Sequence, residues 1–161
     1  MGILGVVKSI YGKPYVIGDM PGLIEGAHKG VGLGYKFLKH IERAKILAHF
    51  VDSSEEVSMI ERYNMLRREL ELYEENKPLS PYHDNEFFNV TKKMEMVVAT
   101  KIETAHKNTL EEFETYLKGK SIKLYKISSL TKDGLNQFLE DMQINIDKID
   151  IIIEENTAEK S

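Results

Sequence analysis

The sequence contains no cysteine among its 161 residues. A disulfide framework and a thiolate metal site are therefore excluded within it. Lys and Arg form no block and the formal net charge is −4, so the composition provides no overall attraction for nucleic acid and we expect no DNA partner. The five histidines, at positions 28, 40, 49, 83 and 106, do not have the spacing of metal ligands.

Long apolar runs are also missing. No run approaches the roughly 18 residues that a membrane span needs, and the first residues lack the charged-then-apolar pattern of a secretory signal. We expect no membrane partner and an intracellular location, with the cytoplasm first and an organelle second. The length favours one domain over residues 1–153, followed by a disordered tail over 154–161.

Glycine, in contrast, is concentrated in one place. Six of the eleven glycines lie from Gly18 to Gly34, and the first of them ends the apolar run Tyr15–Gly18. Asp19 follows that run, and an Asp at the carboxyl end of a strand in an open α/β sheet lies where ligands bind. Gly22 has no Cβ, so its backbone N–H can approach an anionic oxygen. Asp19 is therefore a candidate Mg²⁺ ligand and Gly22 a phosphate contact; taken as four residues alone, Asp-x-x-Gly is more often a tight turn.

The rest of the chain alternates strands and helices. We expect a hairpin from Leu4–Ile10 and Tyr15–Gly18, because Tyr11-Gly12-Lys13-Pro14 between them is typical of a turn. Apolar periodicity predicts further strands over 46–52, 94–99 and 122–127, helices over 34–43, from Ser58, from Thr109 to Gly119 and from Thr131, and a loop over 76–93. This order predicts an α/β fold with a mainly parallel sheet and right-handed crossovers.

Two local expectations concern the middle of the chain. Capping boxes, at Ser58 with Glu61 and at Thr109 with Glu112, predict the starts of two helices. The charged face of the first of these helices is expected to be solvated; its residues are Arg67, Arg68, Glu69, Glu71, Glu74 and Glu75. In the 76–93 loop, Phe87 and Phe88 are expected to anchor the loop to the body of the protein, with a partner protein as the alternative.

The glycine-rich stretch resembles a known family when it is taken at full length. Asp19-Met-Pro-Gly-Leu-Ile-Glu-Gly-Ala27, Gly30-Val-Gly-Leu-Gly34, Phe37–Arg43 and Val51-Asp52 together resemble the switch II region of the Obg family of GTPases. The resemblance implies a Ras-like P-loop NTPase-type G domain, GTP or GDP with Mg²⁺ as ligands, and a role in ribosome assembly with a ribosomal RNA–protein surface as partner. It also implies a set of switch II residues: Pro21, Leu23, Ile24, Glu25 and Gly26.

The same resemblance implies two base-recognition loops. Thr100-Lys101-Ile102-Glu103 stands where G domains carry Asn/Thr-Lys-x-Asp, so that Glu103 replaces the Asp that accepts two bonds from guanine. Ser128 and Ser129 stand in the second loop that faces the base. On its own, each of these strings would be an ordinary turn.

One expected motif is missing from the 161 residues. No Gly-x-x-x-x-Gly-Lys-Ser/Thr string occurs, although it is this string that holds the β and γ phosphates and the Mg²⁺ of a GTPase. We therefore expect a G domain without its first strand and first helix, weak nucleotide binding, and GTP hydrolysis that is lost or very weak. The alternative is a nucleotide-free module that binds a ribosomal or protein partner. In the sheet, we expect either that the strands flanking the missing one pair directly or that sheet edges remain open.

Overall fold

The computed structural model describes residues 4–7, 15–18, 42–54, 56–78, 85–128 and 130–160, of which 4–7, 15–18, 107 and 150–160 are described by their backbone alone. The strands and α-helices are β1 (Leu4–Val7), β2 (Tyr15–Gly18), β3 (Ile46–Asp52), α2 (Met59–Asn76), β4 (Met94–Thr100), α3 (Lys107–Lys118), β5 (Leu124–Ile127) and α4 (Leu135–Lys160). Short 3₁₀ helices, η2 (Glu86–Phe88), η3 (Val90–Lys92) and η4 (Ile102–Thr104), lie between them.

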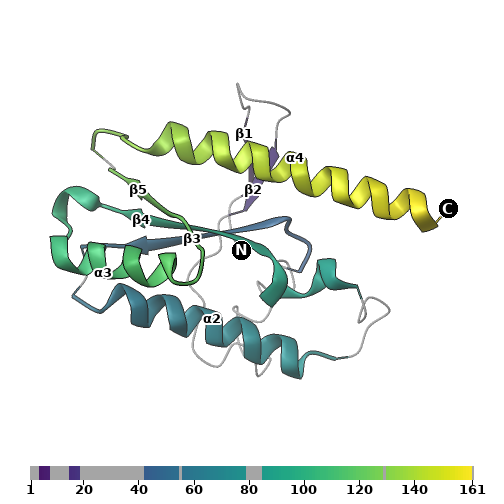
Figure 1. Ribbon diagram of the computed structural model, residues 1–161, viewed down its shortest axis with the longest axis horizontal. Helices are drawn as coiled ribbons and strands as arrows, with labels where there is room; N and C mark the ends of the chain where they lie inside the picture. Colours follow the sequence, from purple (N-terminus) through teal and green to yellow (C-terminus); the bar gives the residue numbers. More distant parts are fainter. Residues whose placement is uncertain are drawn as a thin grey trace.

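Strands β3, β4 and β5 form a parallel sheet in that order. Helix α4 covers one face of the sheet, and helices α2 and α3 cover the other (Figure 1). The central strand β4 alternates between the two layers, because Val97 and Ala99 pack toward α2 and α3 whereas Met96 and Val98 pack toward α4. The α/β fold with a mainly parallel sheet and flanking helices is therefore confirmed.

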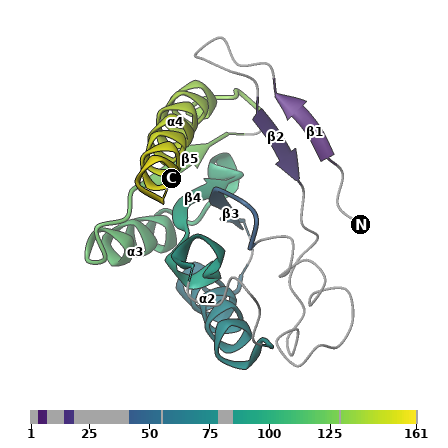
Figure 2. The same ribbon diagram turned by 90° about the vertical axis from the view of Figure 1, so that its right-hand side faces the viewer.

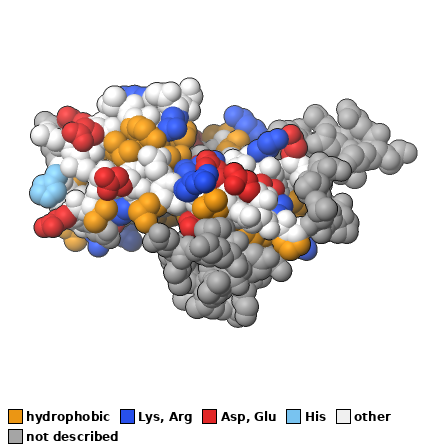
Figure 3. Space-filling model, turned by 90° about the horizontal axis from the view of Figure 1, so that it is seen from below, with side chains coloured by type: hydrophobic (Ala, Val, Ile, Leu, Met, Phe, Trp, Pro, Cys, Tyr) orange, Lys and Arg blue, Asp and Glu red, His pale blue; other side chains and the backbone are white. Residues whose placement is uncertain are grey.

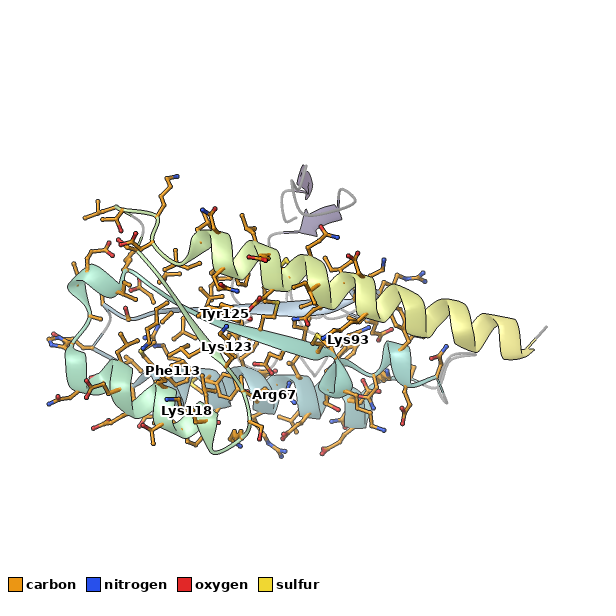
Figure 4. The ribbon with its side chains drawn as sticks, turned by 45° about the horizontal axis from the view of Figure 1, so that its top comes forward. Arg67, Lys93, Phe113, Lys118, Lys123 and Tyr125 are labelled. Atoms are coloured by element: carbon orange, nitrogen blue, oxygen red, sulfur yellow. The ribbon has the colours of Figure 1, made fainter. Side chains whose placement is uncertain are left out.

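Each face of the sheet has its own apolar core. On the α3 side Phe113 is fully buried, and on the α4 side Tyr125 packs edge-on against Phe138 with ring centroids 5.5 Å apart (Figure 4). The Tyr125 hydroxyl donates to the Asp141 carboxylate at 2.6 Å, which fixes the first half of α4 to β5. Burial of this phenol and its bond to Asp141 raise the pKa of Tyr125.

Strands β1 and β2 form the expected antiparallel hairpin, with Leu4 opposite Gly18 and Val7 opposite Tyr15. The hairpin lies to one side of the three-stranded sheet (Figure 2). Among the described strands, β2 pairs only with β1 and β3 only with β4. Of the two outcomes expected for the sheet, direct pairing of the flanking strands is therefore wrong for these residues, and an edge of β3 stays without a described strand beside it.

Helix α2 begins where its capping box predicts. Ser58 is the N-cap, and its hydroxyl oxygen accepts a bond from the Glu61 N–H at 3.4 Å. The apolar side chains that recur at helical spacing along α2 are buried at Tyr63, Leu70 and Tyr73.

We expected the charged face of α2 to be solvated, but part of it is buried. Glu69 is buried, and the Arg67 guanidinium donates to the Glu95 carboxylate at 3.1 Å and to the Thr91 carbonyl at 3.1 Å. The charge pattern of the helix did not predict the bonds of Arg67, because its partners lie on β4 and η3, far away in the sequence. Over the described surface on the α2 and α3 side, acidic and basic side chains are interleaved and do not gather by sign (Figure 3).

Helix α3 ends at Gly119 as predicted but begins earlier than its capping box indicates. Its N-cap is His106, which makes no side-chain capping bond. Thr109 and Glu112 therefore lie inside the helix, and the capping box predicted there is wrong. The 3₁₀ helix η4 ends at Thr104, and α3 starts at Lys107, two residues before Thr109.

The described parts of the 76–93 segment, residues 76–78 and 85–93, include helical residues where we expected a loop. Asn76 is the last residue of α2, and Asn85 and Asn89 cap the two 3₁₀ turns η2 and η3. Val90 is fully buried, whereas Phe87 and Phe88 are half-buried. Val90 is therefore the most deeply buried of these three side chains. The two phenylalanines, which we expected to anchor the segment, are only partly buried.

Two boundaries near the end of the chain also shift. The last strand begins at Leu124 and not at residue 122. Helix α4 begins at Leu135, four residues after Thr131, and reaches Lys160, so it covers most of the segment that we expected to be a tail. None of the helices in the described part of the chain is both long and apolar enough to cross a membrane.

Candidate functional site at the carboxyl edge of the sheet

The switch II predictions fall outside the described residues. These residues are Asp19, Pro21, Gly22, Leu23, Ile24, Glu25 and Gly26, and Ser129 of the second base loop joins them. Among the residues that are described, no group of three acidic or histidine side chains could hold a metal ion. The Mg²⁺ site at Asp19 therefore stays a prediction.

Four of the predicted site residues are described, and all lie at one edge of the sheet. Asp52, Thr100 and Ile127 are the last residues of β3, β4 and β5, and Thr100 is in register with both of the others. The loops that follow these three strands therefore start side by side, at the left of Figure 1. This arrangement brings Thr100, Lys101 and Glu103 to the same edge as Ser128.

The first base loop turns sharply at Lys101. Its φ of 56° lies in the left-handed region, which costs a residue with a Cβ about 1–2 kcal/mol. The Lys101 carbonyl accepts bonds from the backbone N–H and the hydroxyl of Thr104, each at 3.1 Å. The turn carries Glu103 in η4, where its side chain is exposed.

A second set of bonds ties this loop to the end of β3. The Lys101 ammonium lies 2.8 Å from Asp52 Oδ2. The Ser53 N–H and hydroxyl both donate to the Thr100 carbonyl, at 3.0 and 2.5 Å. The hydrogen bond from Lys101, with two further bonds from Ser54, holds the pKa of the Asp52 carboxyl well below its ordinary value.

Sequence reasoning did not identify this role of Asp52. It named Asp52 as the closing residue of the family pattern but gave it no function. The available signal was the one used for Asp19, an acidic residue directly after a buried strand. Because Thr100 is opposite Asp52 in the sheet, the residue that follows Thr100 is within reach of the Asp52 carboxylate.

The second base loop is folded on itself. Ser128 is buried, and its hydroxyl oxygen accepts a bond from the Thr131 N–H at 3.2 Å. Its backbone N–H donates to the Asp133 carbonyl, and its carbonyl accepts from the Lys132 N–H. The Ser128 side chain therefore supports the loop from within, which makes it a structural part of the edge.

Two surface hollows on the described part of the chain lie away from this edge. Surface hollows of about 520 and 530 Å³ lie over α3 and beside α2, and neither is lined by a residue of the two base loops.

A comparison with protein-family models matches residues 3–101 to a family described as a 50S ribosome-binding GTPase. Similar curated proteins carry the name GTPase Obg. The one from Aquifex aeolicus is 41% identical over 140 residues, covering 85% of this chain and 37% of that protein. This chain belongs to the Obg family of GTPases. The Obg protein of Thermodesulfovibrio yellowstonii is 40% identical over 149 residues, covering 91% of this chain and 40% of that protein. The Obg protein of Clostridioides difficile is 33% identical over 158 residues, covering 94% of this chain and 34% of that protein.

The chain thus spans about two fifths or less of the length of these Obg relatives. The family assignment agrees with the fold, since an Obg-type G domain has a parallel sheet flanked by helices. GTP or GDP with Mg²⁺ are the ligands of a GTPase family in general. Of the residues that the resemblance assigns to the nucleotide site, the described ones, Thr100, Lys101, Glu103 and Ser128, lie together at this edge of the sheet.

Proposed function

We propose that this chain recognises the guanine base of GTP or GDP at the carboxyl edge of its sheet. Thr100, Lys101 and Glu103 would form the base loop, and Ser128 and Ser129 belong to the second proposed loop, which follows the neighbouring strand. The observation that carries the proposal is the register of β4 and β5, which starts these two loops side by side. Glu103 supports it further, because its exposed carboxylate can accept two N–H bonds from one base edge.

We propose that binding by these 161 residues is weak and that GTP hydrolysis by them is lost or very slow. The residues contain no Gly-x-x-x-x-Gly-Lys-Ser/Thr string. Three charge-assisted bonds to phosphate, at roughly 1.5–3 kcal/mol each, amount to about 4.5–9 kcal/mol. Without them, affinity falls about a thousandfold or more, and phosphoryl transfer loses the groups that position and neutralise the phosphates.

Asp19 and Gly22 complete the proposed site from the switch side. Asp19 would hold Mg²⁺ through its carboxylate, and the Gly22 N–H would contact a terminal phosphate. The switch II residues Pro21 to Gly26 would respond to that phosphate. The metal would neutralise phosphate charge when bound.

The proposed setting is ribosome assembly in the cytoplasm. The description of the matched family as ribosome-binding supports a ribosomal surface as partner. On the described α2 and α3 side, the interleaved charges do not favour a purely electrostatic RNA contact, so we expect a partner surface that contains protein as well as RNA.

The decisive experiment titrates the purified chain with a fluorescent GTP analogue in the presence of Mg²⁺, and then adds GTP or ATP as competitor. We expect binding in the millimolar range that GTP reverses and ATP does not, with no phosphate release above background. Equal competition by ATP would contradict guanine recognition. No binding at millimolar ligand would favour the nucleotide-free interaction module, which a ribosome co-sedimentation experiment would then test.

A further inference from the structure

The Asp52 carboxylate, at the end of β3, faces the lysine of the base loop on the neighbouring strand. We propose that Asp52 is a positioning residue for guanine recognition, which fixes the Lys101 side chain and the turn that carries Glu103. The inference rests on the proposed function, because it assigns a role within that site. It adds a residue that the base-loop pattern itself does not include.

The Asp52 carboxylate is oriented by hydrogen bonds from Ser54, two residues further along the chain. Asp52 Oδ1 accepts bonds from the Ser54 N–H at 2.8 Å and from the Ser54 hydroxyl at 2.6 Å. These two bonds fix the orientation of the carboxylate and leave Oδ2 directed at the Lys101 ammonium, 2.8 Å away. The Arg62 guanidinium donates to the Asp52 backbone carbonyl and so holds the main chain of the same residue.

The pair acts on a loop that needs support. Lys101 is in the left-handed region, and its backbone is held on the Thr104 side by two bonds and on the Thr100 side by Ser53. The Lys101 side chain is 54% exposed even while its ammonium contacts Asp52. The contact therefore restricts the long side chain without removing it from the surface on which a flat base would lie.

This geometry determines what loss of the Asp52 charge should do. Asp52→Asn keeps an oxygen that can accept the Ser54 bonds but removes the charge that holds the Lys101 ammonium. Lys101 then samples more rotamers, and part of that freedom must be lost when the base binds. Because the ion pair is partly exposed, we expect a moderate effect, about a three- to fivefold weaker affinity for guanine.

The test follows GMP binding by NMR amide shifts of the whole chain, with AMP as the base control. The variants are Asp52→Asn, Lys101→Met and the double variant; Asp52→Glu tests rescue. Glu86→Gln is the matched control, because the Glu86–Lys92 pair has the same 2.8 Å separation but precedes β4, at the other end of the strand. We expect Asp52→Asn to weaken GMP binding three- to fivefold, Glu86→Gln to leave it unchanged, and Asp52→Glu to restore at least half of the loss.

The double variant separates positioning from general support of the fold. If Asp52 acts through Lys101, Asp52→Asn changes nothing further once Lys101 is Met. An equal loss in the presence and absence of Lys101, or wild-type affinity in Asp52→Asn, would overturn the positioning role alone. If GMP shifts no amide of the wild-type chain, the proposed function fails, and the positioning role fails with it.

Discussion

Gly134 shows how strongly one backbone position can determine the second base loop. Its φ is +82°, and a Cβ added there would lie 2.1 Å from the Lys126 carbonyl oxygen. The loop after β5 can therefore close over its own strand only because this residue has no side chain. Lys132, two residues earlier, also has a positive φ of 63°, so the turn that leads into α4 is left-handed twice.

We predict that Gly134→Ala destabilises the protein by at least about 2 kcal/mol, from the left-handed backbone and the steric overlap together. Gly119→Ala is the matched control. Gly119 has a φ of −60°, and a Cβ there would lie in ordinary contact with the Tyr116 carbonyl oxygen, at 3.4 Å. Urea unfolding measures both variants, and equal stability of the two would contradict this account.

Lys93 gives the second prediction at the scale of residues. It is buried between η2 and β4, where its ammonium donates to the carbonyls of Phe87 and Glu42 and lies 4.0 Å from the centroid of the Phe87 ring. Burial lowers the pKa of Lys93 to about 8, although the nearby Glu42 and Glu74 carboxylates oppose this shift.

The unfolded chain should therefore bind more protons than the folded one at pH values from about 8 to 10.5. The free energy of unfolding then rises with pH in this window. We predict that Lys93→Met removes that rise, a difference in slope of up to about 1 kcal/mol per pH unit. Chemical unfolding from pH 8 to 9.5 measures it, below the range in which tyrosines ionise. Parallel slopes for the two proteins would contradict the lowered pKa.

At the scale of elements, the two capping boxes in the sequence have different outcomes. Ser58 caps α2, whereas Thr109 lies within α3, whose N-cap is His106. The same four-residue pattern therefore acts only where the preceding chain arrives in an extended conformation at the right residue. At α3 the 3₁₀ turn η4, fixed by the base loop, decides where the helix starts.

We predict that Ser58→Ala costs about 0.5–1 kcal/mol of stability, because α2 loses its capping acceptor. Thr109→Ala should change stability by less than about 0.5 kcal/mol, since its hydroxyl caps nothing. Thermal unfolding of the two variants side by side checks the contrast. A larger loss for Thr109→Ala than for Ser58→Ala would show that the helix starts differ from those described here.

At the scale of the whole molecule, the alternation of apolar strands and amphipathic helices was enough to predict the parallel sheet and its flanking helices. The burial of Glu69 and the part-buried bonds of Arg67 were not predictable from periodicity, because Arg67 finds its partners on β4 and η3. The same distinction between local pattern and distant contact applies to the candidate site. Thr100, Lys101 and Glu103 follow from a local pattern, whereas the Asp52–Lys101 contact depends on strand register across 49 residues of chain.

The order of the strands has a consequence for the kinetics of folding. Paired residues of β4 and β5 are 27 positions apart in the chain, whereas those of β3 and β4 are 48 apart. Closing the shorter loop costs about 0.5 kcal/mol less chain entropy, so we expect β4, α3 and β5 to form the folding nucleus and β3 to join it later. Mutational φ values should then be higher at Val98 and Leu124 than at Leu47. The Lys101 turn would form inside the nucleus, and its contact with Asp52 would be among the last to close.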